Sequence, residues 1–253
     1  RCTLTVAGTL TLNGNTVTSG AASGGGTSGS AFGSGLFLNG SGTIMFQPGS
    51  GQTQTVSDVI ADQNGSGGSA ALNGVGGVGG VWALNKSGAG NLVLSAANTY
   101  TGGTTVTGGL INFNSAGNFG SGTVTLDGGG LQWASGTTTD ISSRLAPFGS
   151  NGAIFDINGN NVTLASALSG AGGLTLANSG ASAKLTLSAT NTYVGPTVIN
   201  AGVLNVTGSI ASSSSTAVNS GGSLVGTGTV GNTQVNSGGT FAPGTAGVPG
   251  TSM

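Results

Sequence analysis

A 22-residue phrase that occurs twice is the feature that most constrains the fold of this chain. The phrase Leu92–Phe113 reads LVLSAANTYTGGTTVTGGLINF, and residues 185–206 repeat it 93 positions later without a gap. Eleven of the 22 positions are identical, and most others exchange similar residues, such as Val106 for Ile199. Internal repeats indicate an architecture of stacked copies of one unit. We therefore predict structural roles for residues that both copies share: Leu92, Leu94, Asn98, Tyr100, Gly102, Thr104 and Gly109, with Leu185, Leu187, Asn191, Tyr193, Gly195, Thr197 and Gly202.

Short runs of β-forming residues, each stopped by glycine or Asn-Gly, fill the chain, and no segment has a helical period. Such a chain can form a sandwich, a barrel, a propeller or a solenoid. A sandwich has no reason to repeat a 22-residue phrase, whereas a parallel β-helix stacks similar residues at about 4.8 Å. At roughly 20 residues per coil, the repeat offset predicts four to five coils and the whole chain 11–13 coils.

The repeat pattern also predicts which residues face inward. Leucine, valine, isoleucine and alanine form the inward set, and Tyr100, Trp133 and Phe155 are the larger fillers. Asn98 and Asn191 sit where a turn leaves a strand, so we expect them to satisfy turn backbone groups.

The sequence divides into three regions by the regularity of its pattern. We expect irregular coils first, then a regular β-helix that holds both repeat copies (92–113 and 185–206), then coils that end in a Pro/Gly-rich tail. The boundaries are 1–83, with Gly/Ser-rich loops at 19–35 and 64–80, then 84–208 and 209–253.

Composition narrows the class of protein further. Glycine supplies 54 residues and only 4% of residues are charged, against about 25% in typical domains. Disorder is disfavoured because 36% of residues are hydrophobic and lie in alternating runs. The net charge of −1 gives no footprint for nucleic acid. No run of about twenty apolar residues is present, so we expect no membrane-spanning helix.

One phrase around the first copy matches a known pattern. Lys86-Ser87-Gly88-Ala89-Gly90, followed by Leu92, Leu94, Asn98, Tyr100, Gly102 and Thr104, resembles the passenger-associated β-strand repeat of bacterial autotransporters. The second copy departs from it, because Lys184 lies beside Leu185 and Pro196 replaces a glycine. The resemblance implies a right-handed parallel β-helix. It also implies export across the outer membrane of a Gram-negative-type bacterium, with an adhesin-like or scaffold role outside the cell.

Chemical sites are scarce in this sequence. The chain has no His and no Glu, which excludes a Ser-His-Asp triad, an ordinary zinc site and an EF-hand. We predict no catalytic residue and no cofactor. Asp58 and Asp62 are a weak calcium candidate, but turn capping is the favoured role. Asp140 and Arg144 are expected to form a solvated ion pair at a turn.

Three further patterns are expected to be structural. The G-x-G-x-x-G pattern of Gly74, Gly76 and Gly79 lacks the strand, helix and acid of a dinucleotide site. Trp82 and Trp133 can stack on sugars, yet core packing is the favoured role. A Ser-Lys dyad at Lys86-Ser87 and a role for Cys2, the single cysteine, have little support.

Three functions remain open at this point. The first is a non-enzymatic, secreted or cell-surface β-helix that acts as a stalk or adhesive surface, with a host-surface or glycan ligand. The alternative is an extracellular filament or matrix subunit that stacks head to tail, because open solenoid ends leave backbone groups unpaired. A remote alternative is a polysaccharide-active enzyme that uses Asp140 or Asp156.

Overall fold

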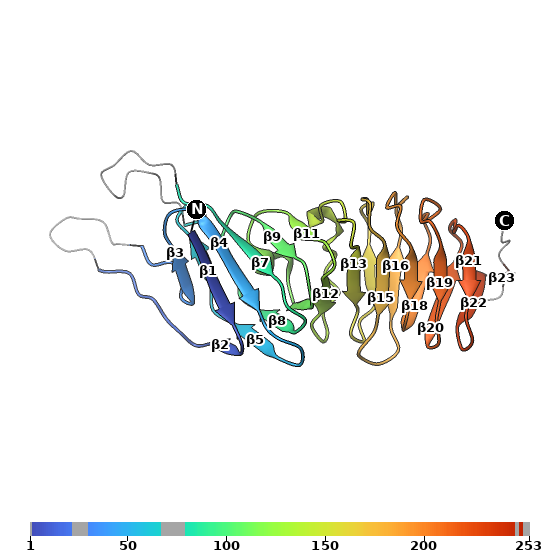
Figure 1. Cartoon of the computed structure of the whole chain (residues 1–253), viewed down its shortest axis with the longest axis horizontal. Coiled ribbons are helices and arrows are strands. Elements are labelled where there is room, and N and C mark those ends of the chain that lie inside the picture. The colour runs from blue at the N-terminus through green and yellow to red at the C-terminus, as the bar shows by residue number, and fades with distance from the viewer. Residues whose placement is uncertain (1, 22–29, 67–78, 246–247, 250–253) are drawn as a thin grey trace.

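The computed structural model describes residues 2–21, 30–66, 79–245 and 248–249. The chain winds from one end of a rod to the other, so that segments close in sequence are neighbours along the rod (Figure 1). It forms a β-solenoid, as the repeat predicted, with about nine turns. The strand pairs are parallel, except for one antiparallel pair near the C-terminal end.

Three main sheets form the walls of the solenoid. The long sheet contains β2 (Leu10–Leu12), β5 (Thr53–Val56), β8 (Asn91–Leu94), β10 (Leu110–Phe113), β12 (Gly130–Trp133), β13 (Ala153–Asp156), β15 (Leu174–Ala177), β17 (Thr197–Ile199), β19 (Thr216–Val218) and β21 (Thr233–Val235). The N-terminal sheet contains β1 (Cys2–Ala7), β4 (Gly42–Gln47), β7 (Trp82–Lys86), β9 (Thr104–Val106) and β11 (Val124–Leu126). The C-terminal sheet contains β14 (Val162–Leu164), β16 (Lys184–Leu187), β18 (Gly202–Val206), β20 (Gly222–Gly226), β22 (Thr240–Thr245) and β23 (Val248–Pro249).

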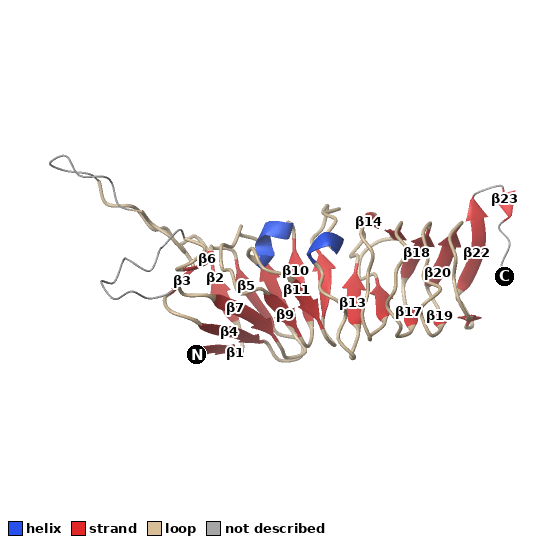
Figure 2. Ribbon diagram, turned by 90° about the horizontal axis from the view of Figure 1, so that it is seen from above, coloured by secondary structure: helices blue, strands red, loops and turns tan. Residues whose placement is uncertain are grey.

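Smaller elements complete the coils. A two-stranded sheet joins β3 (Leu36–Leu38) to β6 (Ile60–Asp62). Two short 3-10 turns, η2 (Ala116–Phe119) and η3 (Ser142–Arg144), lie on the same flank in the middle of the rod (Figure 2). The sequence predicted no helix, and these two turns are the helical elements of the described residues.

Alternation along each strand explains why these residues form walls. In β7 the burial pattern alternates strictly, with Trp82, Leu84 and Lys86 inside. In β4 the inward residues include Ile44 and Phe46. Since successive side chains of a strand point to opposite faces, each run of β-formers supplies one inner and one outer row.

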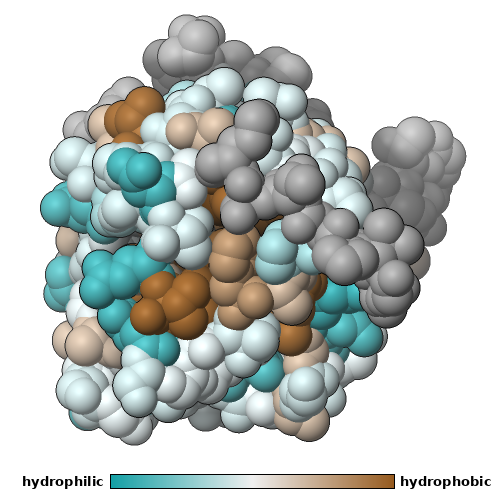
Figure 3. All heavy atoms as spheres, turned by 90° about the vertical axis from the view of Figure 1, so that its right-hand side faces the viewer, coloured by the Kyte–Doolittle hydropathy of each residue, from teal (hydrophilic) through white to brown (hydrophobic). Residues whose placement is uncertain are grey.

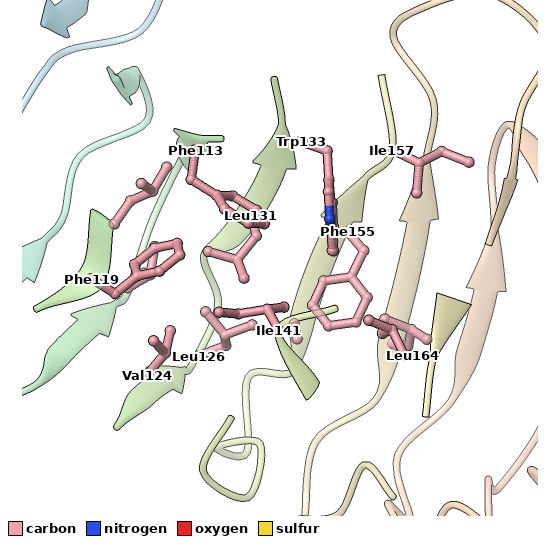
Figure 4. Packing of buried hydrophobic residues seen from close by; sticks show 14 of the residues in the cluster. Phe113, Phe119, Val124, Leu126, Leu131, Trp133, Ile141, Phe155, Ile157 and Leu164 are labelled. Carbon is pink, nitrogen blue, oxygen red and sulfur yellow. The ribbon is translucent and has the colours of Figure 1, made fainter. Parts of the chain in front are cut away.

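The interior is a continuous apolar stack. In the long sheet, Leu92 lies beside Ile111, which lies beside Leu131 in the next coil. Large rings fill the middle of the rod, where the ring of Trp133 lies between those of Phe113 and Phe155, with centroid distances of 5.1 and 5.5 Å (Figure 4). The fillers that the sequence predicted are fully buried: Tyr100, Trp133 and Phe155.

The predicted number of coils was too high. Successive residues of the inner row Leu10, Gln54 and Leu92 are 44 and 38 positions apart, whereas later coils take 17 to 24 residues. The first two coils are long because they contain the Gly/Ser-rich tracts, which the estimate had counted as coils. The parts of these tracts at 22–29 and 67–78, with Gly74 and Gly76, lie outside the described residues, as do tail residues 246–247 and 250–253.

Each copy of the repeat is one complete coil. The first copy begins on β8 and returns to the same sheet at β10, where Leu92 pairs with Ile111. The second begins on β16 and returns at β18, where Leu185 pairs with Leu204. The first copy therefore starts on the long sheet and the second on the C-terminal sheet, about four and a half turns further on. The offset of four to five coils is confirmed, but the copies occupy different walls.

Candidate functional site

The repeated asparagine hydrogen-bonds to the coils on both sides of its own. The Asn98 side chain accepts from Ile60 N at 2.8 Å and donates to Asn118 O at 2.6 Å. Asn191 does the same, accepting from Leu168 N and donating to Ser209 O, each at 2.9 Å. A side-chain amide carries both a donor and an acceptor, so one residue replaces two missing ladder bonds at a corner. The motif therefore clips three coils together.

Replacing Asn98 with Ala is expected to destabilise the chain by about 2 kcal/mol, because Ile60 N and Asn118 O would stay buried without partners. Urea unfolding followed by circular dichroism measures this effect. The matched control is Asn112→Ala, which removes an amide from the outer face of β10. Equal effects of the two variants would contradict the clip.

The repeated tyrosine and threonine form a buried pair. Tyr100 Oη lies 2.6 Å from Thr104 Oγ1, and Tyr193 Oη lies 2.7 Å from Thr197 Oγ1. Burial raises the pKa of Tyr193 to about 12 and that of Tyr100 even further. Neither hydroxyl reaches solvent, so the pair supports the corner and is not a reactive group.

The repeated glycines allow close approach between coils. A Cβ at Gly102 would lie 2.6 Å from the backbone of Trp82, and one at Gly195 would lie 2.3 Å from Gly173 N. Gly109 and Gly202 have φ angles of +59° and +79°, which favour glycine. These positions set the coil spacing.

Lys86 is a buried lysine that faces backbone carbonyls. Its Nζ donates to Ser87 O at 3.1 Å, and to Gly88 O and Gly108 O at 2.9 Å each. The side chain continues the inward row of Leu84, and burial lowers its pKa to about 8. Its ammonium ties the turn after β7 to the turn before β10. This geometry offers Ser87 no general base, because Nζ donates and the residue is fully buried.

The stability of the chain is expected to rise between about pH 8 and pH 10 and to fall above pH 10. Between the two pKa values of Lys86, the unfolded chain holds a proton that the folded chain has lost, so raising the pH favours folding by roughly 1–3 kcal/mol. Above pH 10 the unfolded tyrosines ionise while Tyr100 and Tyr193 do not. Their contribution is present below pH 10 and is lost at about 1.4 kcal/mol per pH unit for each tyrosine.

Urea unfolding at several pH values tests this profile. Lys86→Met should remove the rise, and Tyr193→Phe should halve the slope of the fall. A stability that declines steadily from pH 8 in the unmodified chain would contradict the assignment.

All five aspartates accept hydrogen bonds from turn backbone. Asp62 is fully buried and accepts from Gly65 N at 2.6 Å, Trp82 N at 2.9 Å, and Thr101 N and Oγ1 at 2.8 and 2.9 Å. Asp127 accepts twice from Asn151, at 2.9 Å each. The carboxylates that a hydrolase would need are thus engaged in structural bonds.

Asp58 belongs to a different turn from Asp62. It accepts from Gly14 N at 3.0 Å, and from Asn15 N at 3.1 Å and Nδ2 at 2.6 Å. Desolvation acts to raise its pKa, but these hydrogen bonds hold the pKa below its ordinary value. Calcium would have to displace these N–H donors and those around Asp62. In the described ranges, no three His, Cys, Asp or Glu side chains gather as a metal site requires.

Asp140 and Arg144 do not form the ion pair that the sequence suggested. Asp140 accepts from Ser142 N at 2.8 Å, Ser142 Oγ at 2.6 Å and Ala165 N at 2.9 Å. Arg144 donates to the carbonyls of the preceding coil at Ala116, Gly120 and Gly122. Both side chains therefore hydrogen-bond to the backbone of turns and not to each other.

The two tryptophans lie in the core. Trp133 Nε1 donates to Thr139 O at 2.9 Å, and Trp82 Nε1 donates to Asn39 O at 3.1 Å. Neither presents a ring face for stacking on a sugar, since both are buried. No helix in the described part of the chain has the length and apolarity that a membrane crossing requires.

The outer faces carry ladders of amides. On the long sheet, Asn112 Nδ2 donates to Gln132 Oε1 at 2.7 Å, and Gln132 Nε2 donates to Asp156 Oδ2 at 2.7 Å. At the C-terminal corner, Asn236 Nδ2 donates to Asn219 Oδ1 at 2.6 Å, and Asn219 Nδ2 donates to Asn200 Oδ1 at 2.8 Å. These side chains repeat along the rod and form a polar surface.

The two ends of the rod present different strands. Strands β1 and β2 form the edge at the N-terminal end, and β21 and β22 form the edge at the C-terminal end. The antiparallel strand β23 partly covers β22. Apolar residues lie in the middle of the C-terminal end (Figure 3), and Val235 is 45% exposed there. Only the long sheet reaches both ends of the described solenoid.

Comparison with known proteins matches the repeat to a described family. A family model described as Passenger-associated-transport-repeat matches residues 84–112 and 180–206. The two matched segments are autotransporter passenger repeats. The chain is also 43% identical, over 68 residues, to an adhesin BmaC autotransporter of Brucella suis biovar 1 (strain 1330). The match covers 26% of the chain but only 2% of that relative. No solved structure matches the chain.

Both family matches coincide with the coils described above. The first matched range begins within β7 and ends within β10, and the second ends with β18. Both ranges include the asparagine clip, the tyrosine–threonine pair and the glycines of close approach. The motif that identifies the family is therefore a set of coil-stacking contacts.

Proposed function

We propose that the chain is a non-enzymatic, adhesin-like structural β-solenoid, exported to the surface of a Gram-negative-type bacterium or secreted. One observation carries this proposal: the repeated side chains and all five aspartates make structural hydrogen bonds, most of them between coils. The family match and the adhesin relative support the location. The outer faces are then the surfaces that contact a host surface or a glycan.

Coated beads test the adhesive role. Beads that carry the chain are expected to adhere to a panel of host cells and glycan surfaces. A variant with one lysine on each main sheet, Thr105→Lys, Thr175→Lys and Asn205→Lys, should adhere about tenfold less, because outward charges disturb a surface contact. Its matched control is Thr105→Ser, Thr175→Ser and Asn205→Gln.

Either of two results would contradict the proposal. Adherence no better than that of uncoated beads on every surface would contradict the adhesive role. Turnover of a polysaccharide that Asp140→Asn or Asp156→Asn abolishes would contradict the non-enzymatic role and restore the enzyme alternative.

A second candidate is a subunit that stacks head to tail. It is favoured by the half-exposed Val235 of β21, which lies at the C-terminal end of the long sheet. The N-terminal and C-terminal sheets each reach one end of the rod, and only the long sheet reaches both ends of the described solenoid. Such a joint would therefore pair β21 of one copy with β2 of the next. Electron microscopy separates the two candidates: uniform short rods exclude the filament, whereas long filaments that Val235→Asp abolishes support it.

A further inference from the structure

The middle of the rod is a place where the solenoid changes its walls. The N-terminal sheet has its last strand at β11 and the C-terminal sheet has its first at β14. At this change of walls, the strand pairing that joins one coil to the next is that of β12 with β13, over three residue pairs. Two isolated bridges, Val124 with Leu145 and Phe148 with Gly170, continue the contact on the other side.

Charged residues concentrate in this coil. Residues 127–156, here called the transition coil, contain four of the nine charged residues of the chain: Asp127, Asp140, Arg144 and Asp156. Strand pairing is reduced here, so hydrogen bonds from polar side chains add to the aromatic core and the turn backbone bonds that join neighbouring coils.

The contacts of these side chains cross from coil to coil. Asp156 accepts from Gln132 Nε2 of the preceding coil at 2.7 Å and from Ser179 N of the following coil at 2.9 Å. Asp140 reaches Ala165 N at 2.9 Å, and Asp127 reaches Asn151 N at 2.9 Å. Hydrogen bonds to ionised carboxylates are about twice as strong as neutral ones.

We propose that the transition coil is an acid-sensitive joint, which opens locally when the Asp156 carboxylate that links it to the coils on both sides is protonated, while the coils from β14 onward stay closed. The residues that face these carboxylates do not titrate: Gln132, Ser142, Asn151, Asn158, Ala165 and Ser179. The single cation of the coil, Arg144, faces three backbone carbonyls and acts on Tyr100 electrostatically.

Two further observations agree with this joint. Burial acts to raise the pKa of Asp156, but hydrogen bonds from Ser179, Gln132 and Asn158 hold it below its ordinary value. Protonating this group therefore weakens the folded state, and its contribution is lost as the pH falls through the acidic range. The chain beyond Asp156 contains no Asp and no Glu, so its coils have no carboxylate side chain to lose.

Hydrogen exchange measured by mass spectrometry on the full chain tests the proposal. At about pH 6 the peptides from 127–156 and from 162–226 should be similarly protected. At about pH 3, after correction for intrinsic exchange rates, the transition coil should exchange at least about tenfold faster, which corresponds to one pKa unit of lost interaction. The acid-free coils serve as the internal control.

Variants separate the joint from general acid unfolding. Asp140→Asn with Asp156→Asn should open the transition coil at about pH 6, and Asp127→Asn alone, which changes a carboxylate bonded only to Asn151, should do so to a smaller extent. Asp58→Asn, a clamp outside the joint, should leave exchange at 127–156 unchanged. Equal acid-induced exchange across 127–226, or a transition coil that stays protected at about pH 3, would overturn the proposal.

Discussion

Replacing Asp62 with Ala is expected to destabilise the chain by about 3 kcal/mol and to open the first coils. The buried carboxylate accepts four hydrogen bonds from three segments: the turn at Gly65, the start of β7 at Trp82, and Thr101 of the first repeat copy. Removing it leaves these donors buried without acceptors, which costs more than the loss of an ordinary exposed bond.

Urea unfolding with circular dichroism measures the Asp62 effect, and hydrogen exchange locates it in residues 60–106. The matched control is Asp127→Ala, which removes a half-buried carboxylate with two bonds to Asn151 and should cost less than about 1 kcal/mol. If both variants lose the same stability, then Asp62 is not the clamp that its contacts indicate.

Trp133→Ala is expected to cost about 3–5 kcal/mol, because it leaves a large cavity in the middle of the aromatic core. Trp133 is fully buried between Phe113 and Phe155, and its Nε1 donates to Thr139 O. In a solenoid each coil contacts only its neighbours, so the loss should concentrate in coils from β10 to β13.

Hydrogen exchange checks that pattern along the chain. Peptides from 110–157 should lose protection in Trp133→Ala, while peptides from 202–226 should keep theirs. Val194→Ala is the control, since Val194 is 53% exposed and contributes little to the core. A uniform loss along the rod would show that the coils unfold as one cooperative unit.

Periodicity was enough to predict the solenoid, but it could not assign the walls. Identical residues recur because each copy makes the same coil contacts, as Asn98 and Asn191 do. The wall on which a coil starts depends on the lengths of the intervening corners. Those lengths change where β14 replaces β11 as the partner wall, and no single phrase of the sequence records that change.

The predictions of the coil number and of the Asp140–Arg144 ion pair were wrong because both depend on the turns and loops between strands. Gly/Ser-rich tracts lengthen the first two coils without adding strands to the long sheet. Asp140 and Arg144 are close in sequence, but a solenoid corner exposes many backbone groups that compete for charged side chains. Both side chains therefore hydrogen-bond to turn backbone.

Lys86 shows a signal that the sequence did contain. It continues the alternation of Trp82 and Leu84, which places it on the inner face of β7. Gln54 follows the same rule in β5, where its Nε2 donates to Val6 O and Gly8 O. Polar residues at inward positions of a strand pattern thus indicate backbone carbonyls nearby, although the partners themselves depend on the stacking of coils.

The central claim is that each repeat copy closes one coil, and engineered disulfides test it most directly. In a chain with Cys2→Ser, the pairs Val93→Cys with Asn112→Cys and Thr186→Cys with Asn205→Cys lie directly opposite on neighbouring strands. Neighbouring strands are about 4.8 Å apart, within the Cα separation of about 4.4–6.8 Å that a disulfide accepts. Both pairs should form intramolecular disulfides under mild oxidation, whereas Val93→Cys with Asn205→Cys should not. Failure of both matched pairs, or an intramolecular link in the mismatched pair, would contradict the assignment of each repeat copy to one coil.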